Sequence, residues 1–118
     1  MTFNLNPIEA LDFWRRAVVE CVKKDSHDLS SRQMAVLMMV YLTDSPHTVR
    51  GLAAELNISK PAITRALDRL GSYGLVKRKL DDKDRRSVII QRTVKGSVFL
   101  REFGDMIVNA ARETISKD

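Results

Sequence analysis

Residues 48–70 read TVRGLAAELNISKPAITRALDRL. On both sides of Asn57, apolar side chains recur at the three- and four-residue spacing of a helix. Asn57 suits the left-handed conformation that ends a helix, and Thr48 and Ser59 suit the capping positions that begin one. The pattern therefore predicts a short helix that begins after Thr48, a tight turn, and a second helix over residues 59–72.

A different pattern follows directly, in the stretch GSYGLVKRKLDDKDRRSVIIQR at residues 71–92. Gly71 and Gly74 interrupt the helical spacing. The runs at 75–80 and 87–92 are short and β-prone, and a charged loop of six residues separates them. Two such runs joined by a short polar loop predict an antiparallel hairpin.

The flanking segments predict three more helices. Asn6 followed by Pro7 is typical of a helix start, and the apolar spacing behind it continues to about Lys24. A second helix begins at Ser30 and is apolar nearly all round, which predicts a central, buried position. A last helix begins after Thr93. Its apolar stripe consists of Phe99, Phe103, Met106, Ile107 and Ala110.

These segments define the expected fold class, which is mostly α with a small β-hairpin, in the order αααα-ββ-α. A length of 118 residues suits a single domain with its own core, over residues 1–118. The composition, 44% hydrophobic and 30% charged, is that of an ordinary soluble globular protein. No apolar run approaches the roughly 20 residues of a membrane span, and no basic lead marks a secretory signal.

The few cysteine and histidine residues argue against several kinds of site. Cys21 is the one cysteine, so no disulfide forms within the chain and a reducing, cytoplasmic setting is expected. Its place on the apolar stripe of the first helix favours a structural role over an oxidant-sensing one. His27 and His47 lack metal-ligand spacing, so neither a metal nor another cofactor is expected. No nucleophile stands at a recognisable spacing from a base, which makes an enzyme the weakest interpretation.

Basic residues concentrate in the middle of the chain. Residues 48–101 hold 13 Lys and Arg against 5 Asp and Glu, whereas residues 1–47 hold 5 against 6 and residues 102–118 hold 2 against 4. A basic centre between slightly acidic ends predicts one face that binds a polyanion. An ordinary solvated basic surface is the alternative.

The predicted helix over residues 59–72 has the character of a DNA-reading element. If its apolar side packs inward, small residues and arginines share the opposite face: Pro61, Ala62, Thr64, Arg65 and Arg69. Thr64 suits a base edge or the methyl group of thymine, and the Arg65 guanidinium suits a two-pronged contact with guanine. Ser59 and the free N–H groups beside it suit a phosphate, and Arg69 suits the DNA backbone. An amphipathic helix with solvated arginines is the alternative.

The charged loop of the hairpin, DDKDRR at residues 81–86, favours the DNA-binding interpretation. A loop that holds its shape while it presents cations needs both signs of charge at this density, and a solvated loop does not. We expect Asp84 to orient an arginine through a charge-assisted hydrogen bond, which leaves Lys83 and Arg85 nearer the tip. An arginine there suits the negative potential of a narrow minor groove. The candidate DNA-contacting residues are Thr48, Ser59, Lys60, Pro61, Ala62, Thr64, Arg65, Arg69, Lys83, Asp84, Arg85 and Arg86.

Four segments occur together in this order: LAAELNISKPAITRALDRL at 52–70, GLVKR at 74–78, the pattern DxxDRRSV at 81–88, and Thr93 three residues before Gly96. Together they resemble the winged helix-turn-helix of the MarR family of bacterial transcription regulators. The resemblance extends over about residues 29–96, and the aspartate–arginine loop is its most specific part.

The resemblance implies a homodimer that reads a roughly palindromic operator in double-stranded DNA. Residues 59–72 would lie in the major groove, the wing at 81–87 would reach the minor groove, and the N- and C-terminal helices would pair across the two-fold axis. Only about 25 residues follow the wing, fewer than is usual in the family. That departure argues against the family's usual small-molecule effector pocket and its usual dimer. It favours control by a partner protein, or regulation without a ligand.

Two other functions fit the same fold. A winged helix can serve mainly for protein contact, as an accessory factor on a larger DNA or polymerase complex. It can also act in replication or partition through the same DNA-binding surface. The apolar stripes of the terminal helices, one with Ile8, Leu11 and Trp14 and one with Phe99 and Phe103, are expected to pack both within the chain and between chains.

Overall fold

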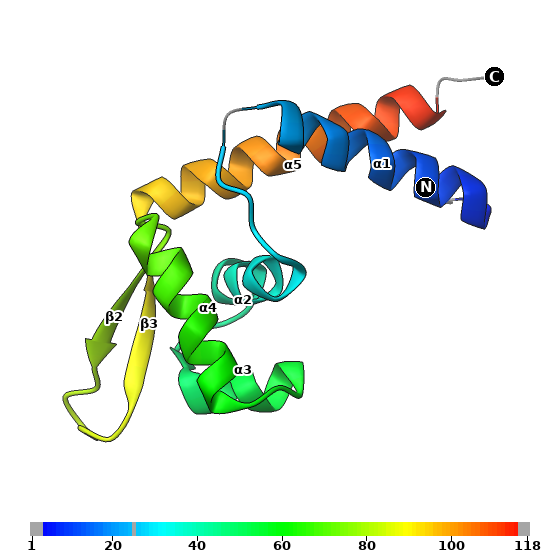
Figure 1. The fold of residues 1–118 in the computed structure, drawn as a ribbon. Helices are drawn as coiled ribbons and strands as arrows, with labels where there is room; N and C mark the ends of the chain where they lie inside the picture. Colours follow the sequence, from blue (N-terminus) through cyan, green and yellow to red (C-terminus); the bar gives the residue numbers. More distant parts are fainter. Residues whose placement is uncertain (1–3, 25, 116–118) are drawn as a thin grey trace. The chain divides into compact units, whose positions relative to one another are not determined.

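The computed structural model describes residues 4–24 and 26–115, so the outermost residues of the expected 1–118 domain lie outside the described residues. Its helices are α1 (Pro7–Lys23), α2 (Ser31–Leu42), α3 (Val49–Leu56), α4 (Lys60–Ser72) and α5 (Val94–Ile115). Its strands are β1 (His47–Thr48), β2 (Val76–Leu80) and β3 (Val88–Arg92). Figure 1 shows the five helices with the hairpin of β2 and β3. The predicted helices and both hairpin strands are confirmed, with bounds that differ by a residue or two.

Two compact units make up the chain. The central unit comprises residues 29–99, and the terminal unit comprises residues 1–28 together with residues 100–118. α5 continues through both, because its residues up to Phe99 belong to the central unit and those from Leu100 to the terminal unit. The expectation of a single domain stays a prediction.

Side-chain caps explain where the helices begin. The Asn6 side chain accepts a hydrogen bond from the Glu9 N–H at 2.9 Å, and the Glu9 carboxylate accepts one from the Asn6 N–H at 3.3 Å. Ser30 and Gln33 form the same reciprocal pair at the start of α2, at 3.1 and 2.9 Å. Each pair satisfies N–H groups that have no partner within the helix, so the predicted starts are confirmed.

The sheet has one more strand than the sequence predicted. β2 and β3 form the expected antiparallel hairpin, in which Arg78 lies opposite Ile90. β1 pairs with the other edge of β3, with His47 opposite Ile90, so the strand order is β1-β3-β2. The class, mostly α with a small β-hairpin, is confirmed, but the order αααα-ββ-α is corrected to ααβααββα. β1 has two residues, too few for the alternating pattern by which a strand is recognised.

The core of the central unit is closed by α2, α3 and α4 with the start of the hairpin. Its largest fully buried side chains, at most 1% exposed, are Val36, Leu37, Val40, Leu52, Ile63, Leu67, Leu70 and Leu75. Full burial of one such side chain stabilises the folded state by about 1.5–3 kcal/mol. The inward stripe of α4 and the central place of α2 are therefore confirmed, and this core positions α4 and the hairpin.

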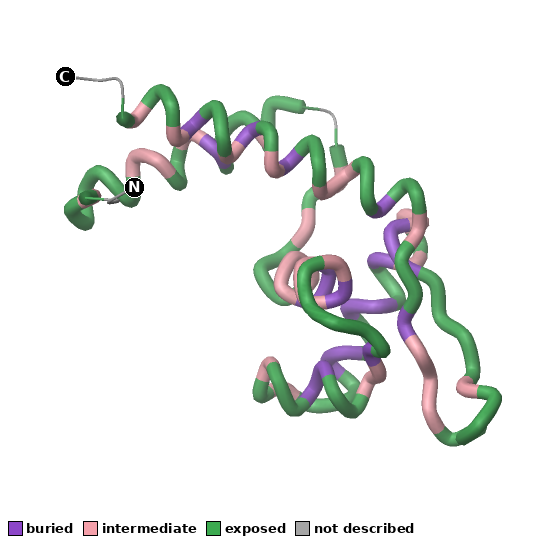
Figure 2. Tube along the Cα trace, turned by 180° about the vertical axis from the view of Figure 1, so that it is seen from behind, coloured by how far each residue is buried: buried purple, intermediate pink, exposed green. Residues whose placement is uncertain are grey.

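The terminal unit buries fewer side chains. α1 contributes Ala17, and α5 contributes Phe103, Met106 and Ala110 at the predicted spacing. The Trp14 ring meets the Phe103 ring edge-on, with centroids 6.3 Å apart. The predicted α1 stripe remains largely exposed at Ile8 (73%), Leu11 (65%) and Trp14 (51%), as do Val18 (38%) and Val22 (74%) of the same helix. Figure 2 shows the trace of α1 mostly in the exposed class. Packing within the chain therefore covers only part of this stripe.

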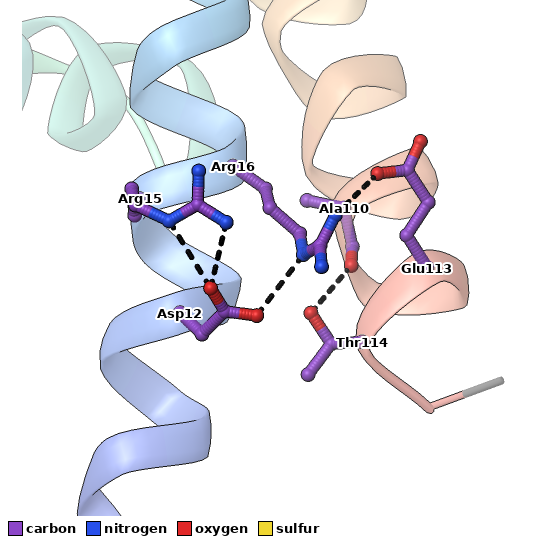
Figure 3. A network of polar contacts seen from close by, with 6 residues as sticks. All are labelled: Asp12, Arg15, Arg16, Ala110, Glu113 and Thr114. Atoms are coloured by element: carbon purple, nitrogen blue, oxygen red, sulfur yellow. Dashed lines mark hydrogen bonds and ion pairs between the residues drawn. The ribbon is translucent and has the colours of Figure 1, made fainter. Parts of the chain in front are cut away.

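A network of ion pairs joins α1 to α5 within the terminal unit (Figure 3). Asp12 accepts hydrogen bonds from Arg15 at 2.7 Å and from Arg16 at 3.1 Å, and Arg16 also reaches Glu113 at 3.0 Å. The hydrogen bonds from Arg15 and Arg16 lower the pKa of Asp12 below its ordinary value of 3.8. The hydrogen bond to Asp12 in turn raises the pKa of Arg16. Asp12 is therefore ionised at neutral pH and orients both arginines.

Cys21 is half-buried and lines a cavity of about 150 Å³ with Val22, Ser26, His27 and Asp28. Its structural role stays a prediction, with oxidant sensing as the alternative. None of the described helices combines the length and the apolar character that crossing a membrane requires.

Candidate nucleic-acid interface

The turn between α3 and α4 has the geometry that the sequence predicted. Asn57 ends α3 in the left-handed conformation, with φ 53° and ψ 45°. The Ile58 N–H donates to the Ala53 carbonyl at 3.1 Å, and the Ser59 hydroxyl accepts the Ala62 N–H at 3.2 Å where α4 begins. These local bonds close a tight helix-turn-helix, which places α4 beside the hairpin (Figure 1).

The outward face of α4 is small and basic. Its exposed candidate residues are Lys60, Pro61, Thr64, Arg65 and Arg69. The prediction that Ala62 lies on this face was wrong, because Ala62 is 7% exposed and belongs to the core. Ala62 stands next to Ile63, at the border of the two faces. Because α2 and α3 both pack against α4, its buried side is wider than a single apolar stripe.

Thr48 and Ser59 both cap a helix with the side-chain oxygen. The Thr48 hydroxyl accepts the Gly51 N–H at 3.0 Å, as the Ser59 hydroxyl accepts that of Ala62. A hydroxyl that accepts one hydrogen bond still has its own hydrogen to donate. Thr48 is half-buried and Ser59 is exposed, so Ser59 is the better placed of the two for a phosphate.

The aspartates of the hairpin loop hold its backbone, in a different way from the one predicted. The Asp84 carboxylate accepts the Arg86 N–H at 3.0 Å, and the Asp81 carboxylate accepts the Lys83 N–H at 3.0 Å. The prediction that Asp84 orients an arginine side chain was wrong, since no ion pair joins Asp84 to an arginine anywhere in the described part of the chain. A short aspartate side chain reaches the N–H two residues ahead and so forms a turn without any partner side chain.

This loop presents three cations. The Ser87 N–H donates to the Asp84 carbonyl at 2.9 Å, which closes the loop at its far side. Lys83, Arg85 and Arg86 are exposed, and none of them forms an ion pair with the residues that the structure describes. Their charges are therefore available to an external anion, on a loop whose shape the two aspartates fix.

One ion pair that the sequence did not reveal joins α4 to β2. Arg78 Nη2 lies 2.7 Å from Asp68 Oδ1. Both side chains are partly exposed, so the pair contributes only about 0–1 kcal/mol to stability. Its role is geometric, because it ties the outward face of α4 directly to a strand of the hairpin. Two residues ten positions apart give no local spacing signal, so only the fold could show that they meet.

A separate groove of about 490 Å³ lies in the terminal unit. Most of its lining is charged, with Arg15, Arg16, Lys23, Lys24 and Arg112 on the basic side and Glu20 and Glu113 on the acidic side. Pockets for small molecules are lined mainly by apolar and aromatic side chains. The expectation that the usual small-molecule effector pocket is lacking stays a prediction.

A helix-turn-helix whose second helix turns arginines outward, with a cationic hairpin beside it, defines a winged helix-turn-helix. Residues 27–87 match the MarR family. The uncharacterised HTH-type transcriptional regulator YdgG of Bacillus subtilis is 32% identical over 112 residues, which are 92% of this chain and 70% of that protein. The chain belongs to the MarR family.

Solved structures share the fold. The transcriptional regulator BldR of Sulfolobus solfataricus is 26% identical, with a TM-score of 0.64 over 97% of this chain and 88% of that one. A MepR variant of S. aureus, bound to an oligodeoxyribonucleotide, is 19% identical, with a TM-score of 0.81 over 94% of this chain and 79% of that one. At 19% identity the second likeness concerns the fold alone.

Proposed function

We propose that the protein is a sequence-specific regulator of transcription that binds double-stranded DNA. The observation that carries the proposal is the combination, in one compact unit, of the arginine face of α4 with the three exposed cations of the wing, Lys83, Arg85 and Arg86. Membership in the MarR family supports it, as does the fold shared with the DNA-bound MepR variant. Such a regulator works where the DNA is, which in a bacterium is the cytoplasm.

In this proposal α4 chooses the sequence. Arg65 donates two hydrogen bonds to a guanine in the major groove, and Thr64 contacts a neighbouring base or the methyl group of thymine. Ser59 and Lys60 bind a phosphate at the start of the helix, where free N–H groups and the helix dipole favour an anion. Arg69, one turn further on, binds the DNA backbone. Base contacts specify the site, and phosphate contacts set the register of the protein on it.

The wing adds affinity with little choice of sequence. Lys83, Arg85 and Arg86 meet the DNA beside the site that α4 reads, and an arginine enters the minor groove, where the potential is most negative. The carboxylates of Asp81 and Asp84 take no direct part, because they bind the loop's own N–H groups. A loop fixed in this way loses little conformational entropy when it binds.

We infer that two copies pair through the exposed stripe of α1. Large apolar side chains that lie together on a surface mark an interaction site more often than chance. Ile8, Leu11 and Val22 are each at least 65% exposed, and Ile115 of α5 is 55% exposed. A two-fold dimer would present two copies of α4 to the two halves of a palindrome.

Selection of bound duplexes from a random pool tests this function. The expected result is an enriched palindromic motif, with half-sites about 10 base pairs apart from centre to centre. Affinity for it should fall steeply as salt rises, as phosphate contacts require. Equal, weak binding to all duplexes at moderate salt would overturn the proposal. If the protein bound all duplexes equally weakly and a pull-down recovered a stoichiometric protein partner, the protein would instead be an accessory module that acts by protein contact.

A further inference from the structure

The Tyr41 hydroxyl of α2 lies between the two strands of the wing, at the end of the hairpin opposite its loop. It donates to the Leu75 carbonyl at 2.6 Å and lies 3.2 Å from the Thr93 carbonyl. It also accepts the Thr93 N–H at 2.8 Å. Leu75 immediately precedes β2, and Thr93 immediately follows β3. One hydroxyl therefore holds the foot of both strands.

The Thr93 side chain closes the same junction from the side of β3. Its hydroxyl donates to the Gly74 carbonyl at 2.8 Å and accepts the Gly96 N–H at 2.9 Å. Gly74 has a positive φ of 75°, which a residue with a side chain seldom adopts. This threonine thus joins the residue that leads into β2 to the first turn of α5.

Arg92, the last residue of β3, binds the end of α2. Its Nε donates to the Val40 carbonyl at 2.8 Å, and its Nη2 donates to the Thr43 carbonyl at 3.1 Å. Its guanidinium carbon also lies 5.9 Å from the centre of the Tyr41 ring. A cation at the C-terminal end of a helix is favoured by the helix dipole and by unpaired carbonyls, so the contact holds β3 to α2.

Gly96 shows how closely these groups approach. A Cβ atom at this position would overlap both the Tyr41 hydroxyl and the Leu75 carbonyl. Any side chain at Gly96 would therefore push Tyr41 away from the strands. We name Tyr41, Arg92, Thr93 and Gly96, with the carbonyls of Gly74 and Leu75, the wing anchor.

We propose that Tyr41 is a positioning residue for DNA binding: its hydroxyl fixes the angle of the wing to α4. The inference rests on the proposed function. The hairpin pairs with β1 along one edge only, and the wing tip extends beyond that edge. The Asp68–Arg78 ion pair ties one strand, β2, to α4, but both of its side chains are partly exposed. The wing anchor is the fixed point that both strands share, because it binds each of them at its foot.

The length of the hairpin makes this angle matter. β2 has five residues, which at about 3.3 Å each place the loop roughly 17 Å from the wing anchor. A tilt of about 5° at the foot then moves the tip by roughly 1.5 Å, which exceeds the tolerance of about 0.5 Å for a well-formed binding site. Loss of the Tyr41 hydroxyl should therefore shift the position of the cations at the tip of the wing.

A double-mutant cycle on the full chain tests the proposal. The variants are Tyr41→Phe, a wing variant in which Lys83, Arg85 and Arg86 are alanine, and the two combined. Tyr41→Phe removes the hydroxyl with both of its hydrogen bonds, to the Leu75 carbonyl and from the Thr93 N–H, and should weaken binding to the selected duplex by roughly three- to tenfold. In the wing variant the same change should have less than about a twofold effect, because coupled residues are not additive. Equal effects in both backgrounds would overturn the proposal in favour of a general structural role.

Thr43→Val is the matched control. Thr43 caps the C-terminal end of α2. Its hydroxyl donates to the Met39 carbonyl at 2.5 Å and lies 3.2 Å from His47 Nε2, so its hydrogen bonds go to neither β2 nor β3. His47 Nε2 keeps the Thr43 carbonyl, at 3.3 Å, when that hydroxyl is lost. We expect this variant to bind the duplex as the wild type does. If Thr43→Val lowered affinity as much as Tyr41→Phe, the effect would not be specific to the wing anchor.

A second variant tests the same proposal if the Tyr41→Phe protein fails to fold. Thr93→Val removes the hydroxyl on the other side of the wing anchor and should reproduce the loss of affinity, and Thr93→Ser, which keeps the hydroxyl, should restore it. Wild-type behaviour of Thr93→Val would overturn the proposal.

Hydrogen exchange on the free protein separates this proposal from the proposed function. Tyr41→Phe should speed exchange of the backbone amides of β2 and β3, from 76 to 92, and leave those of α4 unchanged. Unchanged exchange in the hairpin would overturn the role of Tyr41 even if the protein binds DNA. If wild-type protein bound no DNA selectively while Tyr41→Phe loosened the hairpin, the proposed function would fail and the mechanical role of Tyr41 would stand.

Discussion

The central unit and the terminal unit differ in how completely they bury their apolar side chains. In the central unit the leucines at 37, 67, 70 and 75 are fully buried. In the terminal unit Ile8 and Leu11 are 73% and 65% exposed, although they lie on the predicted apolar stripe of α1. The polar groups differ too: the central unit uses side chains to hold backbone groups of the wing, whereas the terminal unit uses an ion-pair network between two helices.

This difference separates two tasks. A unit with a closed core keeps its surface geometry without a partner, which a DNA reader needs because its contacts must be held in place before binding. A unit that leaves an apolar stripe uncovered gains stability from a second molecule. Changes in the central unit should therefore alter folding and DNA recognition, and changes in the terminal unit should mainly alter association.

Truncation of a core leucine should lower the free energy of unfolding more than any other change proposed here. A small loss would contradict the difference in burial between the two units. Leu67→Ala should destabilise the protein by about 2–5 kcal/mol, the cost of a buried leucine with its cavity. Leu42→Ala, at a leucine that is 72% exposed, is the control and should change stability by less than about 0.5 kcal/mol. Urea denaturation followed by circular dichroism measures both, and equal losses would contradict the closed core.

Replacement of an exposed leucine in α1 tests the terminal unit. Leu11→Ser should raise the dissociation constant of the dimer at least about tenfold, because burial of a leucine contributes about 1.5–3 kcal/mol. Sedimentation over a range of concentrations measures the constant. Leu42→Ser in the central unit, which removes a leucine that is 72% exposed against 65% for Leu11, should leave the dissociation constant unchanged. A wild-type protein that stays monomeric at every concentration would remove the dimer from this account.

The wing should show its charge in the salt dependence of binding. Lys83→Ala should weaken binding to most duplexes and lower the slope of log affinity against log salt by about 1, the effect of one lost phosphate contact. Lys24→Ala removes the same charge from a residue of the terminal unit that has no part in the proposed DNA contacts, and it should leave the slope unchanged. If both variants gave the same slope, the salt dependence would not support phosphate contacts by the cations of the wing.

The smallest effect should come from Asp12, and it depends on pH. Because the pKa of Asp12 is lowered below 3.8 in the folded state, its stabilising effect is present above that pH and is lost as pH falls through the folded value. The melting temperature of Asp12→Asn should therefore lie below that of the wild type at about pH 6 and approach it toward about pH 2. A constant gap over this range would show that the ion pairs of Asp12 do not contribute.

Local patterns were enough to predict most of the fold. Caps at Asn6, Ser30 and Ser59, the left-handed Asn57 and the β-prone runs of the hairpin each depend on residues a few positions apart, so the sequence displays them. β1 was missed because a two-residue strand exists only through its pairing with β3. Its position could be found only from the fold.

For the candidate site, the sequence predicted which residues are exposed better than it predicted the contacts that their side chains make. Thr64, Arg65 and Arg69 are exposed on α4, but Ala62 is buried because two helices pack against that side. Asp84 was expected to bind a side chain and binds a backbone N–H instead, a choice that depends on loop conformation. The wing anchor joins α2 to residues 34 and 52 positions away, and no spacing rule brings such residues together.

The central claim is that α4 selects the DNA sequence while the wing adds affinity. The most direct test compares the affinities of the wild type, Arg65→Ala and Arg85→Ala for the selected duplex and for a scrambled duplex of the same length. All measurements are made at one salt concentration. Arg65→Ala should lower affinity for the selected duplex by roughly ten- to hundredfold, the discrimination of one two-pronged base contact, and should lower the ratio of the two affinities. Arg85→Ala should weaken binding to both duplexes by a similar factor. A ratio that falls with Arg85→Ala and is kept by Arg65→Ala would contradict the account.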